Sequence, residues 1–168
     1  MVDRTAPPIK VDYLQLQLGV LSELLNSMAS PLHENAFGIS VRELRILRFA
    51  YVEPGLNLGR LMAQTVIEKT VLSKLVTSLV RRGFMKREID AVDARCVNLF
   101  LTRRGVDVVL RADAFSRSWE EGVLSILTPE EDVILKNCLA KLTAYAKEQI
   151  SEANTQKKPT SIQTEART

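Results

Sequence analysis

Residues 68–105, EKTVLSKLVTSLVRRGFMKREIDAVDARCVNLFLTRRG, decide the fold. Their first part predicts a helix from about Glu68 to Arg82, with Gly83 as its C-terminal stop. The apolar side chains of this helix recur at three- and four-residue spacing and form one face, made of Leu72, Leu75, Val76 and Leu79. Because the opposite face is polar, we expect the helix to pack on a core with one side and to meet solvent or a partner with the other.

The second part of this stretch changes its period. Apolar and polar residues alternate in the segment 95–101, and a turn-rich sequence at 90–93 separates it from the segment 84–89. This pattern predicts a β-hairpin. A helix followed by a hairpin is typical of a winged helix-turn-helix, whose second helix enters a DNA major groove while the hairpin reaches the neighbouring backbone or minor groove.

Two shorter helices are predicted before residue 68. The first of them opens with a capping box, from Ser40 to Glu43, and ends before Pro54. Asn57 caps the second, after which β-branched residues weaken the helical pattern and predict a turn near 65–67.

The remaining helices flank this central part. An N-terminal helix begins at Leu14 and is expected to end before Pro31. After the hairpin, Thr102 caps a long helix that Gly105 interrupts only mildly, and a second capping box at Thr128 starts the last helix. The predicted fold class is mainly α with a small β-hairpin, in the order α-α-α-α-β-β-α-α.

Length and composition exclude several classes of protein. The chain has 168 residues, of which 46% are hydrophobic and 26% charged, with 7 Gly and 6 Pro. Collagen-like, low-complexity and wholly disordered chains do not have this composition. No apolar stretch approaches the roughly 20 residues of a bilayer span, and the N-terminal residues lack the apolar core of a secretory signal, so we expect a cytoplasmic bacterial protein without a membrane partner.

The chain is long enough for one ordinary domain, which we expect to cover residues 11–150. Within it, the winged helix-turn-helix occupies about 40–101. The dimerisation helices occupy about 11–30 and 102–150. Residues 1–10 are expected to be a flexible N-terminus and 151–168 a disordered tail.

Basic residues gather in the stretch that decides the fold. From Lys69 to Arg87 there are six basic residues and no acidic one, while the whole chain carries a net charge of only +3. The rest of the chain is therefore net acidic. A local block of this kind is typical of a surface that contacts nucleic-acid phosphates.

The residues expected to contact DNA lie on the polar face of the 68–82 helix and in the hairpin. They are Lys69, Thr70, Ser73, Lys74, Thr77, Arg81, Arg82, Arg87, Asp93 and Arg95. Lys74 can reach guanine O6 and N7, and Arg95 can enter a narrow minor groove. Arg81 and Arg82 lie where cations also offset the helix dipole, so a structural role for one of them is an alternative. Asp93 either fixes the hairpin turn by pairing with an Arg or is a simple turn residue.

The stretch 68–105 resembles the MarR (multiple antibiotic resistance regulator) family of bacterial transcription factors. The matching pieces are T-V-L-S-K-L-V at 70–76, R-R-G-F at 81–84 with the following Arg87, D-x-x-D-x-R from Asp90 to Arg95, and L-T-x-x-G at 101–105. A looser resemblance, in element order and in the T-P-E-E start of the last helix, covers about residues 11–149. Two departures are Ala91, where the family often has Pro, and Thr65-Val66, where Leu-Gly is frequent.

The resemblance implies a homodimeric repressor or activator that binds a pseudo-palindromic double-stranded DNA operator and is often controlled by a small aromatic or phenolic effector. The flanking helices carry apolar stripes that need partners, which supports a dimer. Its expected interface residues are Leu18, Leu21, Trp119, Val123, Leu139 and Leu142. An effector pocket would lie between the dimerisation helices and the winged module. Tyr13, Arg45 and Arg48 could contribute polar groups to it, although we favour a surface or interface position for each of them.

Three other functions remain as alternatives. A winged-helix module can bind protein instead of DNA, and would then show little salt dependence. A redox-sensing regulator would use a thiol, for which Cys96 beside Arg95 is the better candidate, although we expect both Cys96 and Cys138 to be buried or half-buried small apolar residues. An enzyme would need a cysteine and His33 together, which nothing in their spacing favours, and a single histidine without C-x-x-C motifs gives no metal site. We therefore expect no catalytic residues, no metal and no cofactor.

Overall fold

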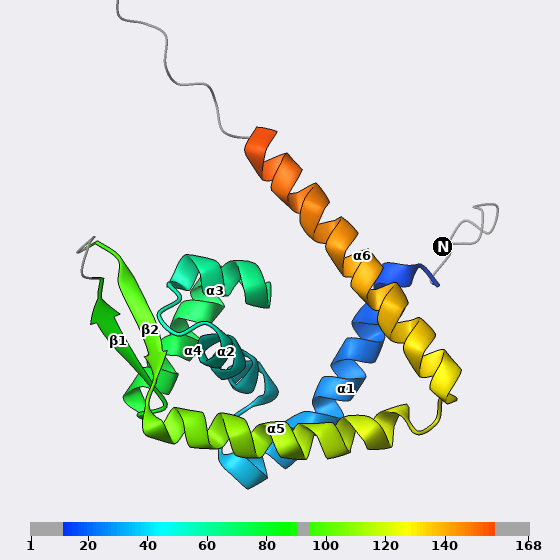
Figure 1. Ribbon diagram of the computed structural model, residues 1–168, viewed down its shortest axis with the longest axis horizontal. Coiled ribbons are helices and arrows are strands. Elements are labelled where there is room, and N and C mark those ends of the chain that lie inside the picture. The colour runs from blue at the N-terminus through cyan, green and yellow to red at the C-terminus, as the bar shows by residue number, and fades with distance from the viewer. Residues whose placement is uncertain (1–11, 91–94, 157–168) are drawn as a thin grey trace, which may run out of the picture. The chain divides into compact units, whose positions relative to one another are not determined.

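The computed structural model describes residues 12–90 and 95–156. Its elements follow the predicted order and confirm the predicted fold class (Figure 1). They are α1 (Leu14–Phe37), α2 (Val41–Val52), α3 (Leu58–Thr65), α4 (Lys69–Arg81), β1 (Met85–Ile89), β2 (Val97–Leu101), α5 (Arg103–Leu124) and α6 (Pro129–Gln156). The chain divides after Ser116 into two compact units. The first holds α1 to α4, the hairpin and most of α5, and the second holds the end of α5 and α6.

The core of the first unit lies where α2, α3, α4 and the hairpin meet. Leu44 and Leu47 of α2, Leu61 of α3, and Leu72 and Leu79 of α4 are fully buried there. Burying a leucine side chain contributes roughly 1.5–3 kcal/mol to folding. Because α4 gives its apolar face to this core, its opposite face is fixed toward the outside.

The short helices start at the predicted caps. The Glu43 backbone N–H donates to the Ser40 hydroxyl at 3.2 Å, and the Ser40 N–H donates back to the Glu43 carboxylate at 2.9 Å. Asn57 accepts from the Arg60 N–H at 2.9 Å. These hydrogen bonds confirm the predicted caps at Ser40 and Asn57. Each cap joins groups only three residues apart, which is why the sequence could predict it.

The hairpin pairs β1 with β2 in antiparallel register, with Met85 opposite Leu101. It is anchored on the loop before α3, since the Gly55 N–H donates to the Leu99 carbonyl and the Leu99 N–H donates to the Leu56 carbonyl, both at 3.0 Å. The hairpin therefore extends from the same core that holds α4.

Helix α1 does not end before Pro31, as the sequence led us to expect, but continues to Phe37. A proline inside a helix removes one hydrogen bond and costs about 3 kcal/mol. The turn after Pro31 offsets this cost through contacts with α5. The buried His33 ring lies 3.0 Å from the Ser116 hydroxyl, and both His33 and Phe37 pack edge-on against Phe115.

Helix α6 also exceeds its predicted limit. It starts at the expected capping box, in which the Thr128 N–H donates to Glu131 at 2.8 Å, and it ends at Gln156. Residues 151–156 are thus helical, although they were assigned to the disordered tail, because polar residues that extend an existing helix each add a backbone hydrogen bond. The predictions for residues 1–10 and 157–168 fall outside the described residues.

Two kinds of feature are absent from the residues that the structure describes. No helix in the ranges 12–90 and 95–156 is both long and apolar enough to cross a bilayer. In the same ranges, no group of three or more His, Cys, Asp or Glu side chains could hold a metal ion.

Candidate nucleic-acid interface

Helix α4 separates a buried apolar face from an exposed polar one. Leu72, Val76 and Leu79 are buried, and Leu75 is half-buried. On the opposite side, five residues of the predicted DNA set are exposed and Ser73 is half-buried. The exposed five are Lys69, Thr70, Lys74, Thr77 and Arg81. The face thus presents hydroxyls between ammonium groups, which can donate to base edges and phosphates.

The C-terminal half of this face is slightly hollowed. Ser73, Lys74, Thr77, Ser78 and Arg81 line a shallow depression of about 260 Å³. Polar side chains from successive turns therefore lie on one continuous surface of α4, with Arg81 at its end.

A carboxylate caps the start of α4. Glu68 accepts from the backbone N–H of Thr70 at 2.9 Å and from that of Val71 at 3.1 Å. These backbone hydrogen bonds, assisted by the nearby Lys74, hold the pKa of Glu68 below its ordinary value. The sequence placed the helix start near Glu68 but missed this role, because Glu is not a common N-cap residue. Its place directly before the first helical residue was the available signal.

Arg82 points back into the protein, unlike Arg81. It donates to Glu43 at 2.7 Å and to the Gly38 carbonyl, and its guanidinium carbon lies 5.0 Å from the centre of the Phe84 ring. The Arg82 side chain is 32% exposed and that of Glu43 only 10%. The structural alternative therefore fits Arg82, and we assign this residue to the fold rather than to the DNA surface.

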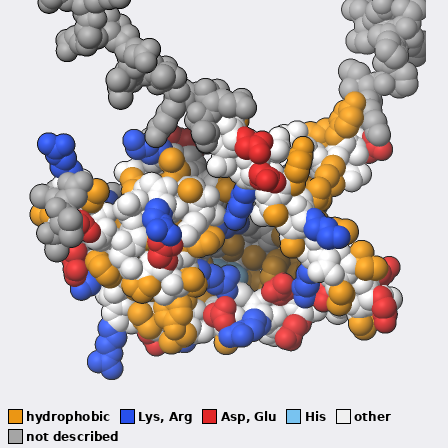
Figure 2. Space-filling model, turned by 45° about the horizontal axis from the view of Figure 1, so that its top comes forward, with side chains coloured by type: hydrophobic (Ala, Val, Ile, Leu, Met, Phe, Trp, Pro, Cys, Tyr) orange, Lys and Arg blue, Asp and Glu red, His pale blue; other side chains and the backbone are white. Residues whose placement is uncertain are grey.

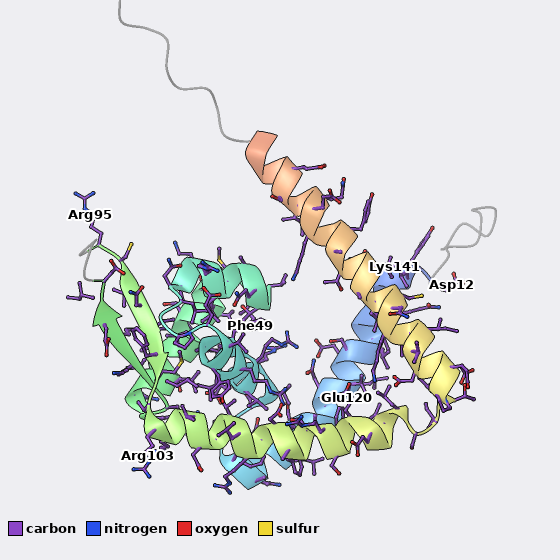
Figure 3. All side chains as sticks on the ribbon, in the orientation of Figure 1. Asp12, Phe49, Arg95, Arg103, Glu120 and Lys141 are labelled. Atoms are coloured by element: carbon purple, nitrogen blue, oxygen red, sulfur yellow. The ribbon has the colours of Figure 1, made fainter. Side chains whose placement is uncertain are left out.

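The hairpin presents two further cations of the predicted set. Arg87 of β1 is exposed and donates to the Thr77 hydroxyl of α4 at 2.9 Å, which ties the hairpin to the helix. Arg95 lies at the tip of the hairpin, and its exposed side chain points away from the helices (Figure 3). Asp93, the other predicted residue of the tip, lies outside the described residues.

The comparisons with known proteins agree with this geometry. The MarR family model matches residues 39–97, from the loop before α2 to the start of β2. The HTH-type transcriptional regulator BilQ of Clostridium symbiosum is 30% identical over 105 residues, which cover 62% of this chain and 73% of BilQ. The chain belongs to the MarR family.

Two more matches extend over most of this MarR family chain. The HTH-type transcriptional repressor Mb2911 of Mycobacterium bovis is 28% identical over 131 residues, which cover 77% of this chain and 91% of the repressor. The crystal structure of S. aureus MepR in complex with DNA has a TM-score of 0.68 at 21% identity, and covers 80% of this chain and 96% of MepR. The last of these matches shows a shared fold.

The turn between α3 and α4 keeps a glycine-like backbone without a glycine. Val66, which stands where MarR family sequences often have Gly, adopts a φ of 55° in the left-handed region. Its N–H donates to the Met62 carbonyl at 3.0 Å, and its side chain is 80% exposed. A β-branched residue is strained in this region, so the turn is formed at a cost in stability.

The six residues predicted for a dimer interface differ in exposure. Leu18 and Leu21 of α1 are exposed, as are Leu139 and Leu142 of α6, whereas Trp119 and Val123 of α5 are half-buried. Figure 2 shows such hydrophobic side chains at the surface, between charged ones. Cys138 of α6 is exposed as well, contrary to our expectation of a buried or half-buried thiol.

Two surface hollows lie in the first unit between α1, α2 and the start of α4, and the smaller is lined mainly by polar groups. Their volumes are 430 and 310 Å³, and Glu23, Asn26, Arg42 and Val71 line both. Arg45, one of the residues considered for an effector pocket, lines the smaller hollow. The other two do not line either hollow: Arg48 is 3.5 Å from Asp113, and Tyr13 precedes α1.

The thiol and imidazole groups occupy separate settings. His33 is buried, within 2.9 Å of the Ala29 carbonyl and 3.0 Å of the Ser116 hydroxyl. Cys96 is half-buried directly before β2, and its carbonyl accepts from the Asp90 N–H at 3.0 Å. His33 thus contacts α1 and α5, whereas Cys96 lies in the hairpin.

Proposed function

We propose that the protein is a sequence-specific transcriptional regulator that inserts α4 into the major groove of double-stranded DNA and the hairpin into the adjacent minor groove. The observation that carries the proposal is the outward face of α4, where Lys69, Thr70, Lys74 and Thr77 are exposed over a buried leucine face. Membership of the MarR family and the regulator names of its relatives support it. Such a regulator acts on DNA in the bacterial cytoplasm and has no catalytic role.

The residues divide between reading bases and holding the backbone. Ser73 and Lys74 lie mid-helix, where short hydroxyl and long ammonium groups reach base edges. Arg81, at the end of α4, is suited to a phosphate. Arg95, at the hairpin tip, is suited to the focused negative potential of a narrow A·T-rich minor groove.

A homodimer would place two copies of α4 on one face of the duplex. The exposed apolar side chains of α1 and α6, among them Leu21 and Leu142, support this assembly because water otherwise covers them. Two recognition helices about 34 Å apart would read a pseudo-palindrome with half-sites one DNA turn apart. In this proposal residues 40–101 bind DNA, while 11–30 and 102–150 form the dimer.

Control by a small aromatic or phenolic effector is the remaining part of the proposal. The two hollows beside α1, α2 and the start of α4 touch the DNA-reading helix, and the smaller of them is lined by Arg42 and Arg45. A ligand that favours one position of α4 over another shifts the population of the DNA-binding form.

A mobility-shift titration tests the proposal. The probes are the DNA upstream of the protein's own gene and an unrelated duplex of equal length, each at two ionic strengths. We expect preference for the upstream DNA and a steep loss of affinity with salt. Lys74→Ala should change the preferred base at particular positions, and Arg81→Ala should weaken both probes about equally. If the affinities for the two probes are equal and do not change with the salt concentration, a protein-binding module is favoured instead.

A further inference from the structure

Four helices of the first unit are joined through one residue, Arg82. Arg82 is the C-cap residue of α4. Its side chain donates to the carboxylate of Glu43 in the first turn of α2 and to the carbonyl of Gly38, which caps α1. The backbone carbonyl of Arg82 accepts from the Arg104 guanidinium at 3.0 Å, at the start of α5. The end of the recognition helix is therefore tied to three other helices.

The carboxylate in this cluster has no freedom to move away. One oxygen of Glu43 accepts from Arg82 at 2.7 Å, and the other accepts from the Ser40 N–H at 2.9 Å. The Glu43 side chain is 10% exposed, so rotation away from Arg82 would leave a buried charge without its partner. The ion pair thus fixes the position of the C-terminal end of α4 relative to the first turn of α2.

An aromatic ring restrains the guanidinium further. The centre of the Phe84 ring lies 5.0 Å from the guanidinium carbon of Arg82 and 4.4 Å from that of Arg104. Phe84 is itself buried in the core, and its N–H donates to the Leu79 carbonyl of α4. A planar guanidinium that both stacks and donates to two acceptors has little room to reorient.

We propose that Arg82 is a positioning residue for DNA recognition, which sets the angle of α4 by fastening its C-terminal end to the corner between α1 and α2. The inference rests on the proposed insertion of α4 into DNA. Arg81 precedes it by one residue and faces about 100° away around the helix, where its charge is available to a phosphate. Because α1 also carries apolar residues proposed for the dimer, the Gly38 contact relates α4 to the second copy of the chain.

Variants at the two arginines distinguish positioning from charge. Affinity is measured for a duplex selected by the wild type from a random pool and for an unrelated duplex, over a series of salt concentrations. Arg81→Ala should weaken both duplexes and make the salt slope shallower by about 0.9. Arg82→Ala should lower affinity for the selected duplex by about tenfold, spare the unrelated one and keep the wild-type slope. Arg82→Lys should behave in the same way, because an ammonium does not reproduce the two-pronged donor geometry.

If Arg82→Ala does not fold, a double-mutant cycle that combines Glu43→Gln with Arg82→Lys tests the same inference. Glu43→Gln retains a capping-box side chain while it removes the charged partner. It should reproduce the loss of selectivity, and the Glu43→Gln/Arg82→Lys double variant should lose little more than either single variant. Thermal unfolding establishes that each variant is folded at the assay temperature.

The inference is overturned if Arg82→Lys or Glu43→Gln, once folded, keeps the wild-type ratio of the two affinities. It is also overturned if Arg82→Ala makes the salt slope shallower, as Arg81→Ala does, because Arg82 would then contact phosphate. A wild-type protein that binds neither duplex would refute the proposed DNA binding itself.

Discussion

Replacement of Gly105 by alanine is expected to destabilise the protein, although alanine is the better helix former. Gly105 is buried in α5, and a Cβ atom there would collide with the backbone carbonyl of Phe84 and lie 3.4 Å from the Leu101 Cβ. That carbonyl cannot move freely, because it accepts from the Thr102 N–H at 3.1 Å and from the Thr102 hydroxyl at 3.3 Å. The glycine thus permits α5 to start directly against the base of the hairpin.

The expected size of the effect follows from three contributions. Alanine gains about 1 kcal/mol in helix propensity. Overpacking costs about 1–3 kcal/mol, and disturbance of the cap at Thr102 costs about 1 kcal/mol more. We therefore expect Gly105→Ala to lower the free energy of unfolding by about 2 kcal/mol, which lowers Tm by roughly 4–8 °C for a chain of this length.

Gly122→Ala is the matched control in the same helix. A Cβ at Gly122 meets no atom within 4 Å, so the propensity gain is unopposed there and Tm should rise by a few degrees. Both variants are compared with the wild type by thermal unfolding followed by circular dichroism. One fixed protein concentration is used, because the Tm of the proposed dimer would depend on concentration. Equal shifts for the two glycines would refute the reasoning.

Three further predictions concern the recognition helix and the hairpin. Val66→Gly should raise the free energy of unfolding by about 0.5–1 kcal/mol in a urea titration, because relief of left-handed strain exceeds the entropy that glycine adds to the unfolded chain; an unchanged midpoint would contradict it. The pKa of Glu68 is lower in the folded protein than its ordinary value of 4.5, so the ionised carboxylate stabilises the fold at pH values above 4.5, and this stabilisation is lost as the pH falls through the folded pKa. The Tm difference between wild type and Glu68→Gln should therefore shrink in acid; a constant difference would count against the cap. Arg95→Ala should weaken operator binding several-fold at moderate salt, and unchanged affinity in a mobility-shift titration would refute the minor-groove role.

Local interactions are the part of this fold that the sequence predicted well. The caps at Ser40, Asn57 and Thr128 each join groups three residues apart, so a short window contains both partners. The two faces of α4 follow from the period of apolar residues in the same way. The identity of every helix and strand could be predicted on this basis.

Contacts between residues far apart in the chain could not be predicted from the sequence. Pro31 carries a strong local signal to end α1, but packing of His33 on Phe115 and Ser116 outweighs it, and those partners lie about eighty residues further along the chain. The role of Arg82 likewise depends on Glu43, 39 residues earlier. No window of sequence contains such pairs, so the period and the caps could not reveal them.

Ion pairs reduce the number of basic side chains that can contact DNA phosphates. The sequence predicts that all six basic residues of the segment 69–87 belong to one phosphate-binding surface. In the structure, however, Arg82 is paired with Glu43 at 2.7 Å and Lys86 with Glu88 at 2.6 Å. Within the described residues, no ion pair engages Lys69 or Lys74, which stand on the exposed face of α4. Three of the four other cations of this block, Lys69, Lys74 and Arg81, therefore lie on α4, and the fourth, Arg87, is hydrogen-bonded to α4 through Thr77. Because that charge moves with α4, affinity and selectivity both depend on the angle at which the helix is held, and a small rotation of α4 would change them together.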